Sequence, residues 1–139
     1  HDWNTLSAKI EPESTANNSI QIESPCPILR IFDEDKAKEY YIDFLGFKID
    51  WEHRFEENYP LYCQISHGNL TLHLSGHHGD ASPGSTVFAR MKGLKEFHKE
   101  LSSKEYKHAK PNIVEQPWGS EMTITDPFNN SIRFTESKV

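Results

Sequence analysis

Cysteine is scarce in this chain, and long apolar runs are missing. Its 139 residues include only two cysteines, Cys26 and Cys63. Two are too few for a disulfide framework, so we expect both to be free thiols on strands. No apolar run is long enough to cross a bilayer or to form the core of a secretion signal. These absences predict a cytoplasmic protein with no membrane partner.

Basic residues are outnumbered by acidic ones, with 15 Lys and Arg against 21 Asp and Glu, and the formal net charge is −6. This balance argues against nucleic acid or an anionic membrane as a partner and is compatible with a cationic ligand. The chain also lacks a glycine-rich phosphate loop, and nothing in the sequence brings Ser, His and Asp or Cys and His together as a nucleophilic site. The length is that of one domain with its own core.

The first 24 residues differ in composition from the rest, being rich in Ser, Asn, Glu and Thr, and they begin at His1. We divide the chain into this arm, 1–24, which is either a native segment or a remnant of a precursor or fusion, and a domain over 25–137. Asp2 is placed to cap a short helix, and apolar alternation predicts a strand over 20–23. The apolar residues of that predicted helix are Trp3, Leu6 and Ile10.

A hairpin is the clearest local signal. Two β-prone runs, Glu121–Thr125 and Ser131–Thr135, flank the segment 126–130, in which Pro127 fixes φ and two asparagines tolerate left-handed geometry. Strand side chains alternate, so one face of the second strand is apolar and the other is polar.

The remaining pattern repeats one order of elements. Asp33 is expected to cap a helix over 34–45 that ends at Gly46, and a second helix is expected over 94–103. Period-two alternation indicates strands elsewhere, at 27–32, 47–55, 61–66, 70–75, 86–91 and 112–115. With a glycine-rich linker over 76–84, the sequence predicts two tandem βαβββ units.

Two aromatic patterns are interpreted differently. Tyr40, Tyr41 and Phe44 recur at helical spacing and are expected in the core. In the strand over 47–55, one face is expected to carry Phe47, Ile49, Trp51, His53 and Phe55, and the other Lys48, Asp50, Glu52 and Arg54.

The ordered motifs carry a family resemblance. Trp118-Gly119, then Asp126-Pro127-x-x-Asn130, then a strand that closes near Glu136 is one part of it. The other part is near the start of the domain, where Pro27–Asp33, Tyr40-Tyr41 and Leu45-Gly46-Phe47 follow in order. The set resembles the glyoxalase/bleomycin resistance protein/dioxygenase family of the vicinal oxygen chelate superfamily, and most of all its bleomycin-resistance branch.

The resemblance implies an α+β fold, in which two βαβββ units form a curved mixed sheet that encloses a cavity, with helices on the convex face. The residues it places toward the cavity are Thr71, His73, Ser75, Ser131, Arg133 and Thr135. It also implies a homodimer, in which the N-terminal arm makes contacts with the partner.

Enzymes of this superfamily hold a divalent metal with four side chains, one from each of four strands. Carried over by motif, those positions fall at Cys26, His73, Ser85 or Thr86, and Arg133. A guanidinium stays protonated in proteins and cannot ligate a cation. We therefore expect no metal, no other cofactor and no catalytic residues. A rival metal site would use His53, His73, His77 and His78, whose spacing matches no known ligand motif.

The non-enzymatic branch of the family sequesters bleomycin-type glycopeptide antibiotics, whose planar rings and cationic tail need aromatic faces with acidic residues nearby. Candidate ligand-binding residues are Phe32, Trp51, His53, Phe55, Tyr59, Tyr62, His73, Trp118 and Arg133. Nearby acidity would come from Asp33, Glu52, Glu56, Glu57 and Glu121.

Alternatives remain at this point. Trp51, Phe55 and Trp118 are as well explained by packing in the core or at a dimer interface. Arg133 is either an anchor for a polar or anionic ligand group or the buried partner of Glu121. The protein as a whole is expected to sequester an antibiotic. It could instead be an enzyme of the same superfamily with a displaced or absent metal, or a binding protein for an unrelated small molecule.

Overall fold

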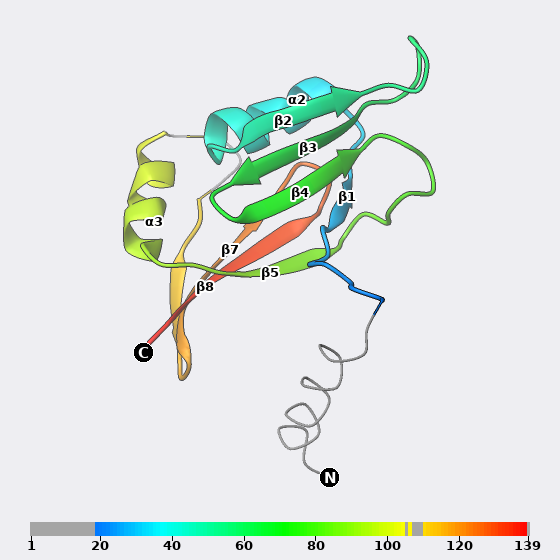
Figure 1. Ribbon diagram of the computed structural model, residues 1–139. Coiled ribbons are helices and arrows are strands. Elements are labelled where there is room, and N and C mark those ends of the chain that lie inside the picture. Colours follow the sequence, from blue (N-terminus) through cyan, green and yellow to red (C-terminus); the bar gives the residue numbers. More distant parts are fainter. Residues whose placement is uncertain (1–18, 105, 107–109, 139) are drawn as a thin grey trace.

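The computed structural model describes residues 19–104, 106 and 110–138. Within these residues, eight strands and three helical segments follow each other in two similar halves (Figure 1). The first half contains β1 (Ile28–Arg30), α2 (Glu34–Lys38), η1 (Glu39–Phe44), β2 (Lys48–His53), β3 (Tyr62–His67) and β4 (Leu70–Ser75). The second contains β5 (Thr86–Arg90), α3 (Leu94–Ser103), β6 (Ile113–Gln116), β7 (Gly119–Thr125) and β8 (Ser131–Ser137).

Each half forms its own four-stranded mixed sheet. The first sheet has the order β1-β4-β3-β2 and the second β5-β8-β7-β6, so the two orders correspond strand by strand. In each, the first strand is parallel to the last one and the other pairs are antiparallel. The predicted α+β fold of two tandem βαβββ units is confirmed. The two sheets do not close into a barrel (Figure 1).

The first helix begins and changes form for local reasons. The Asp33 side chain accepts a hydrogen bond of 2.9 Å from the backbone N–H of Lys36, as predicted for a cap. After α2 the helix widens into the π-helical segment η1, where the N–H of Leu45 reaches the carbonyl of Tyr40. Gly46 then ends it with φ of +84°. The helix predicted over 34–45 is therefore present, with a π-helical half that its periodicity did not indicate.

A single apolar core joins the two halves. It contains the helix-facing residues of both sheets together with the buried faces of α2, η1 and α3. Leu72 of the first sheet and Met122 of the second are both fully buried. Phe97 of α3 contacts Phe134 of β8 and His67 of β3, with ring centroids 5.2 and 5.7 Å apart. The predicted core position of the η1 aromatics is confirmed, since all three are buried.

Hydrogen bonds to Asp126 connect the C-terminal hairpin to the first half of the fold. One carboxylate oxygen accepts the backbone N–H groups of Phe128 and Asn130, each at 2.8 Å. The other accepts the Tyr41 hydroxyl at 2.6 Å and the Asn130 amide at 3.0 Å. Asn130 also donates to the carbonyl of Arg30 in β1. The predicted hairpin is confirmed, and its Asp-Pro-x-x-Asn motif has a structural role.

Two expectations about the N-terminal side need correction. The strand predicted over 20–23 is absent from the structure, which shows irregular chain there with Ile22 93% exposed. The predicted helix with Trp3 lies outside the described residues. Cys63 lies on β3 as expected, but Cys26 precedes β1, and both are free thiols. No helix in the described part of the chain is long and apolar enough to span a membrane.

Candidate functional site: the polar face of the first sheet

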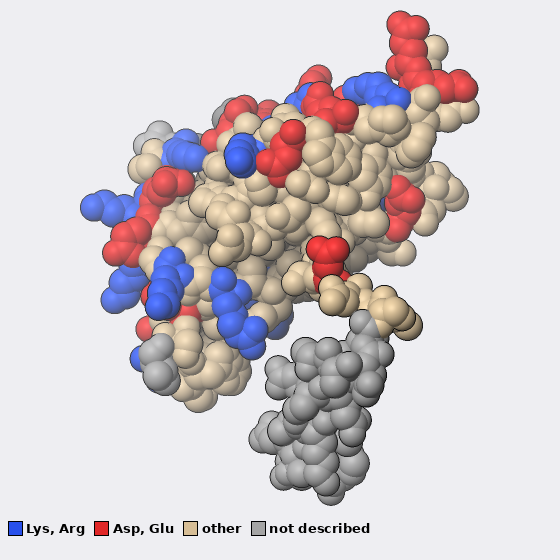
Figure 2. Space-filling view, in the orientation of Figure 1, with Lys and Arg blue, Asp and Glu red and all other residues tan. Residues whose placement is uncertain are grey.

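The side of the first sheet that faces away from the helices carries most of the predicted ligand-binding residues. We call it the first polar face and define it by Asp50, Trp51, His53, Tyr62, Gln64 and His73. It forms because Leu72 and Leu74 of β4 point into the core, so that His73 between them points away from it. Its surface over β3 and β4 is mostly free of charged side chains, which gather toward the edges (Figure 2).

A β-bulge in β2 corrects the predicted alternation of that strand. Ile49 pairs with Ile65, yet Trp51 pairs with Gln64, so Asp50 is an extra residue between the two pairs. Ile49 therefore shares the core side with Ile65, whereas Trp51 lies on the opposite side. The prediction that placed Ile49 and Trp51 on one face and Asp50 on the other was wrong, because the pattern was read without an insertion.

Three rings form the centre of the first polar face, and we call them the Trp51 cluster. Trp51 and Tyr62 are nearly parallel, with an interplanar angle of 11° and centroids 6.0 Å apart. The His73 ring meets both at its edge, 5.3 Å from Trp51 and 5.2 Å from Tyr62. Trp51 remains 42% exposed. Its indole is thus held in place and still offers a flat surface to solvent.

A chain of hydrogen bonds runs under these rings. The Tyr62 hydroxyl lies 2.7 Å from Nδ1 of His73, and Nε2 of His73 lies 3.1 Å from Oε1 of Gln64. Gln64 donates from Nε2 to Asp50 at 3.1 Å, and the Ser66 hydroxyl donates to Asp50 at 3.0 Å. These bonds lower the pKa of Asp50, with Gln64 as the larger cause. Along β3, the alternation of Tyr62, Gln64 and Ser66 is the sequence signal that places these three side chains on one face.

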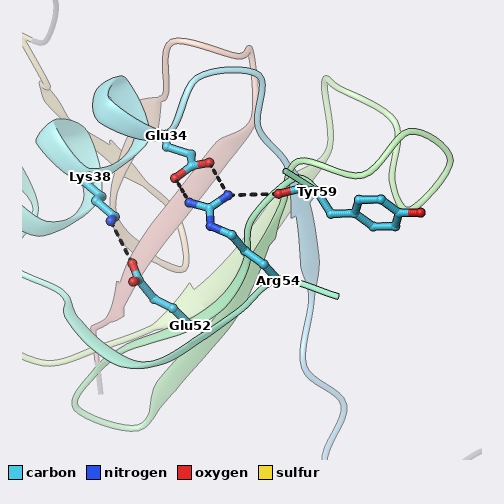
Figure 3. A network of polar contacts seen from close by, with 5 residues as sticks. All are labelled: Glu34, Lys38, Glu52, Arg54 and Tyr59. Carbon is cyan, nitrogen blue, oxygen red and sulfur yellow. Dashed lines mark hydrogen bonds and ion pairs between the residues drawn. The ribbon is translucent and has the colours of Figure 1, made fainter. Parts of the chain in front are cut away.

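The aromatic surface continues along the end of β2. His53 packs edge-on against Phe55, and Phe55 packs against His77, with centroids 4.5 and 5.3 Å apart. Arg54, which lies between His53 and Phe55 in the sequence, points to the opposite side of the strand. Its guanidinium forms an ion pair with Glu34 of α2 through two hydrogen bonds (Figure 3). It also donates to the carbonyl of Tyr59 at 3.0 Å. This network holds the loop after β2 against the helix, and with it the exposed ring of Tyr59.

The other predicted residues lie elsewhere. Arg133 is on β8 of the second sheet, and Trp118 is in the turn between β6 and β7. Both line a hollow of about 610 Å³ on the side of that sheet away from its core. Phe32 follows β1, lies under the guanidinium of Arg30 and contacts Phe128. The structure therefore brings together Trp51, His53, Phe55, Tyr62 and His73, and separates them from the rest.

The contacts on the second sheet exclude one of the two interpretations of Arg133. Arg133 is exposed, and the described residues contain no ion pair between it and Glu121. Glu121 instead accepts hydrogen bonds from the indole of Trp118 at 2.9 Å and from Thr135 at 3.1 Å. The pairing with Glu121 was wrong, and the anchor interpretation of Arg133 stays a prediction.

The four positions implied as metal ligands are divided between the halves. His73 is on β4, with Cys26 just before the neighbouring β1, whereas Arg133 is on β8. Both ring nitrogens of His73 are already hydrogen-bonded within the chain. Among the described residues no group of three or more His, Cys, Asp or Glu is arranged to hold a metal ion. That the protein binds no metal stays a prediction.

Comparison with known proteins identifies the family of this chain and solved structures with a similar fold. The family model described as "Glyoxalase superfamily protein" matches residues 10–139. The structure of the bleomycin-binding protein from bleomycin-producing Streptomyces verticillus, complexed with copper(II)-bleomycin, shares 21% identity and a TM-score of 0.65, covering 86% of this chain and 99% of that one. The bleomycin resistance determinant encoded on transposon Tn5 shares 20% identity and a TM-score of 0.64, with 85% and 100% covered.

TnmS3, an antibiotic binding protein from Streptomyces sp. CB03234, shares 17% identity and a TM-score of 0.64, covering 86% of this chain and 100% of that one. A comparison with curated protein sequences finds no match. At such identities the solved structures show a common fold, whereas the family model spans nearly the whole sequence. The chain belongs to the glyoxalase superfamily.

Proposed function

We propose that the protein binds and sequesters a planar aromatic, cationic small molecule of the bleomycin type, without catalysis, in the cytoplasm. The observation that carries this proposal is the Trp51 cluster, in which an indole is fixed by Tyr62 and His73 and yet stays 42% exposed. A large aromatic surface held rigid and left open suits stacking, because little side-chain entropy is lost when a ligand binds. Solved structures of the same fold are described as antibiotic-binding proteins, two of them with bleomycin bound.

The formal charge of −6 suits a cationic ligand. Close to the Trp51 cluster, Asp50 carries a negative charge at neutral pH, as an ordinary aspartate does, and the hydrogen bonds it accepts lower its pKa further. Glu52 does not add to this charge, because it lies opposite the buried Cys63 on the helix side of β2 and is ion-paired with Lys38 of α2 (Figure 3). Both thiols are free, as in a reducing compartment.

We further propose that a homodimer completes the binding groove. Among the described residues, the hollow on the second sheet is lined by that sheet, by the segment just before β6 and by the turn after it, and by none from the first sheet. The first polar face is likewise uncovered around Trp51. A two-fold partner would place the hollow on the second sheet of one protomer over the first polar face of the other, which would cover both aromatic surfaces in one step.

Calorimetry with copper-free and copper-loaded bleomycin tests this function. Stacking contributes about 0.5–1.5 kcal/mol for each aromatic pair, and buried ring area adds about 25 cal/mol per Å². Trp51→Ala should therefore weaken binding by roughly 10- to 100-fold, while Trp51→Phe, which keeps a ring, should lose much less. Lys99→Gln, at an exposed residue of α3 away from the first polar face, is the control and should change nothing.

The result that contradicts this function is an absence of heat and of tryptophan fluorescence change at high micromolar bleomycin. Sedimentation of the same sample tests the dimer, which a monomer at micromolar concentration would refute. If binding persists undiminished in Trp51→Ala, the ligand lies elsewhere, and the first polar face is not the site.

A further inference from the structure

The hydrogen-bond chain beneath the Trp51 cluster has a direction that Asp50 sets. An ionised carboxylate only accepts hydrogen bonds, so Gln64 must turn its amide nitrogen toward Asp50. The amide oxygen of Gln64 then faces Nε2 of His73 at 3.1 Å. An oxygen there requires a proton on Nε2, so the neutral imidazole carries its hydrogen on that nitrogen.

The hydrogen bond between Tyr62 and His73 has its donor and acceptor fixed in the same way. With the hydrogen on Nε2, Nδ1 of His73 has only a lone pair, and the Tyr62 hydroxyl at 2.7 Å must donate to it. An ordinary tyrosine keeps its proton at neutral pH, and burial raises the pKa of Tyr62 further. The single hydroxyl proton of Tyr62 is therefore already donated to Nδ1 of His73. The Tyr62 oxygen therefore has only lone pairs left to offer a ligand.

We propose that Asp50 and Gln64 are positioning residues that make Tyr62 a hydrogen-bond acceptor, so that the site selects an aromatic ligand with an N–H or O–H donor beside the ring stacked on Trp51. This inference rests on the proposed function for the place of the ligand, and it adds the chemistry of the selected edge. A ligand edge that only accepts, such as a ring oxygen or a carboxylate, meets lone pairs at Tyr62 and is disfavoured.

The first test needs no ligand. Long-range ¹H–¹⁵N NMR at pH 8, where an unperturbed imidazole is neutral, identifies which nitrogen of His73 carries the hydrogen. The wild-type protein should show the Nε2–H tautomer. In Asp50→Asn the amide of residue 50 both donates and accepts, so the chain can run either way, and a measurable share of Nδ1–H should appear. Asp43→Asn, an exposed Asp on η1, is the matched control and should leave the tautomer unchanged.

A swapped pair gives the rescue. In the double variant Asp50→Asn and Gln64→Glu, the carboxylate moves next to His73 and accepts from Nε2, while residue 50 donates to it. The Nε2–H tautomer should return, although both side chains differ from the wild type. A merely structural role for Asp50 would not be restored by this exchange, because the variant keeps neither original group.

The second test uses two neutral probes of the same shape, indole, which donates from its N–H, and benzofuran, which has a ring oxygen instead. Neutral probes remove the effect of the charge lost in Asp50→Asn. One hydrogen bond corresponds to roughly a two- to tenfold preference for indole in the wild type. The preference should fall toward one in Asp50→Asn and return in the double variant, measured by NMR shifts of the Trp51 indole.

The outcomes separate the two proposals. An Nδ1–H tautomer in the wild type, or no tautomer change in Asp50→Asn, overturns the positioning role whether or not bleomycin binds. A tautomer that changes as expected, with equal affinity for indole and benzofuran throughout, overturns the selection of a donor edge. Failure of bleomycin to bind, with the tautomer and probe results as expected, removes the antibiotic and keeps the donor-selective site.

Discussion

Tyr41→Phe tests how strongly the Asp-Pro-x-x-Asn turn is bound to the rest of the fold. Tyr41 is 1% exposed, and its hydroxyl donates to Asp126 at 2.6 Å. A hydrogen bond to a charged group contributes about 1.5–3 kcal/mol. Asp126 keeps three other donors in this variant, two backbone N–H groups and the Asn130 amide. The carboxylate thus stays largely satisfied, and the cost should lie at the lower end, about 1.5–2 kcal/mol.

Asp126→Ala should cost far more than Tyr41→Phe. It leaves the Tyr41 hydroxyl, two backbone N–H groups and one N–H of the Asn130 amide without their acceptor, and each buried donor left unpaired costs about 1–3 kcal/mol. We expect more than about 4 kcal/mol, which is enough to unfold many domains. Urea unfolding followed by tryptophan fluorescence measures both variants, and Tyr59→Phe, at an exposed loop residue, is the control. A Tyr41→Phe cost below about 0.5 kcal/mol would refute the structural role that we assign to the motif.

Three further predictions concern thiols, pH and metal. Cys63 is buried, and burial raises its pKa to about 11, so an aromatic disulfide reagent at pH 8 should react with Cys26 in the native protein and with both thiols only after unfolding. Arg54 lowers the pKa of Glu34 through a hydrogen bond, and the stability from that pair is present above the unfolded pKa of about 4.3 and lost as pH falls through the lower folded value. Arg54→Met should therefore lower Tm slightly at pH 7 and less at pH 3, and an equal loss at both values would contradict this linkage. Elemental analysis should find no stoichiometric zinc, nickel or manganese, whereas one equivalent that is lost in His73→Ala would favour the enzyme alternative.

Most elements of the fold were predictable because their signals are local. Asp33 and Gly46 mark the two ends of the first helix by side-chain capping and by positive φ. The second helix, α3, has the bounds that its periodicity predicts. The hairpin follows from Pro127 and the asparagine pair, and Asn129 does adopt a positive φ of 71°. Such signals need no knowledge of which strands pair.

The π-helical segment could not be predicted in the same way. The spacing of Tyr40, Tyr41 and Phe44 fits an ordinary helix, and the widening shows only in backbone hydrogen bonds such as that from Leu45 to Tyr40. The bond from the Tyr41 hydroxyl to Asp126 spans 85 positions of sequence. Contacts of that separation leave no trace in the periodicity of either segment.

The aromatic residues of the candidate site were predicted from the sequence. The polar residues whose role depends on strand pairing were missed. Trp51 and Tyr62 were predicted because aromatic rings suit an aromatic ligand, and His73 because the family resemblance places it toward the cavity. The structure does bring the three together. The residue types of Asp50 and Gln64 carry no such signal, since an acidic residue and an amide are ordinary on a strand surface, and alternation along β3 places only Gln64 on the face of Tyr62. Their role depends on lying side by side across β2 and β3.

The bulge at Asp50 explains how both kinds of residue reach one face. Without it, regular pairing from Ile49 and Ile65 would set Asp50 opposite Gln64 and Trp51 opposite Cys63, which is buried on the core side. Trp51 would then point toward the helices, and the first polar face would lose its exposed ring. The extra residue lets the strand present the carboxylate and the indole together. One insertion thus creates the stacking surface and, through Gln64 and His73, sets the hydrogen-bonding direction of the Tyr62 hydroxyl beside it.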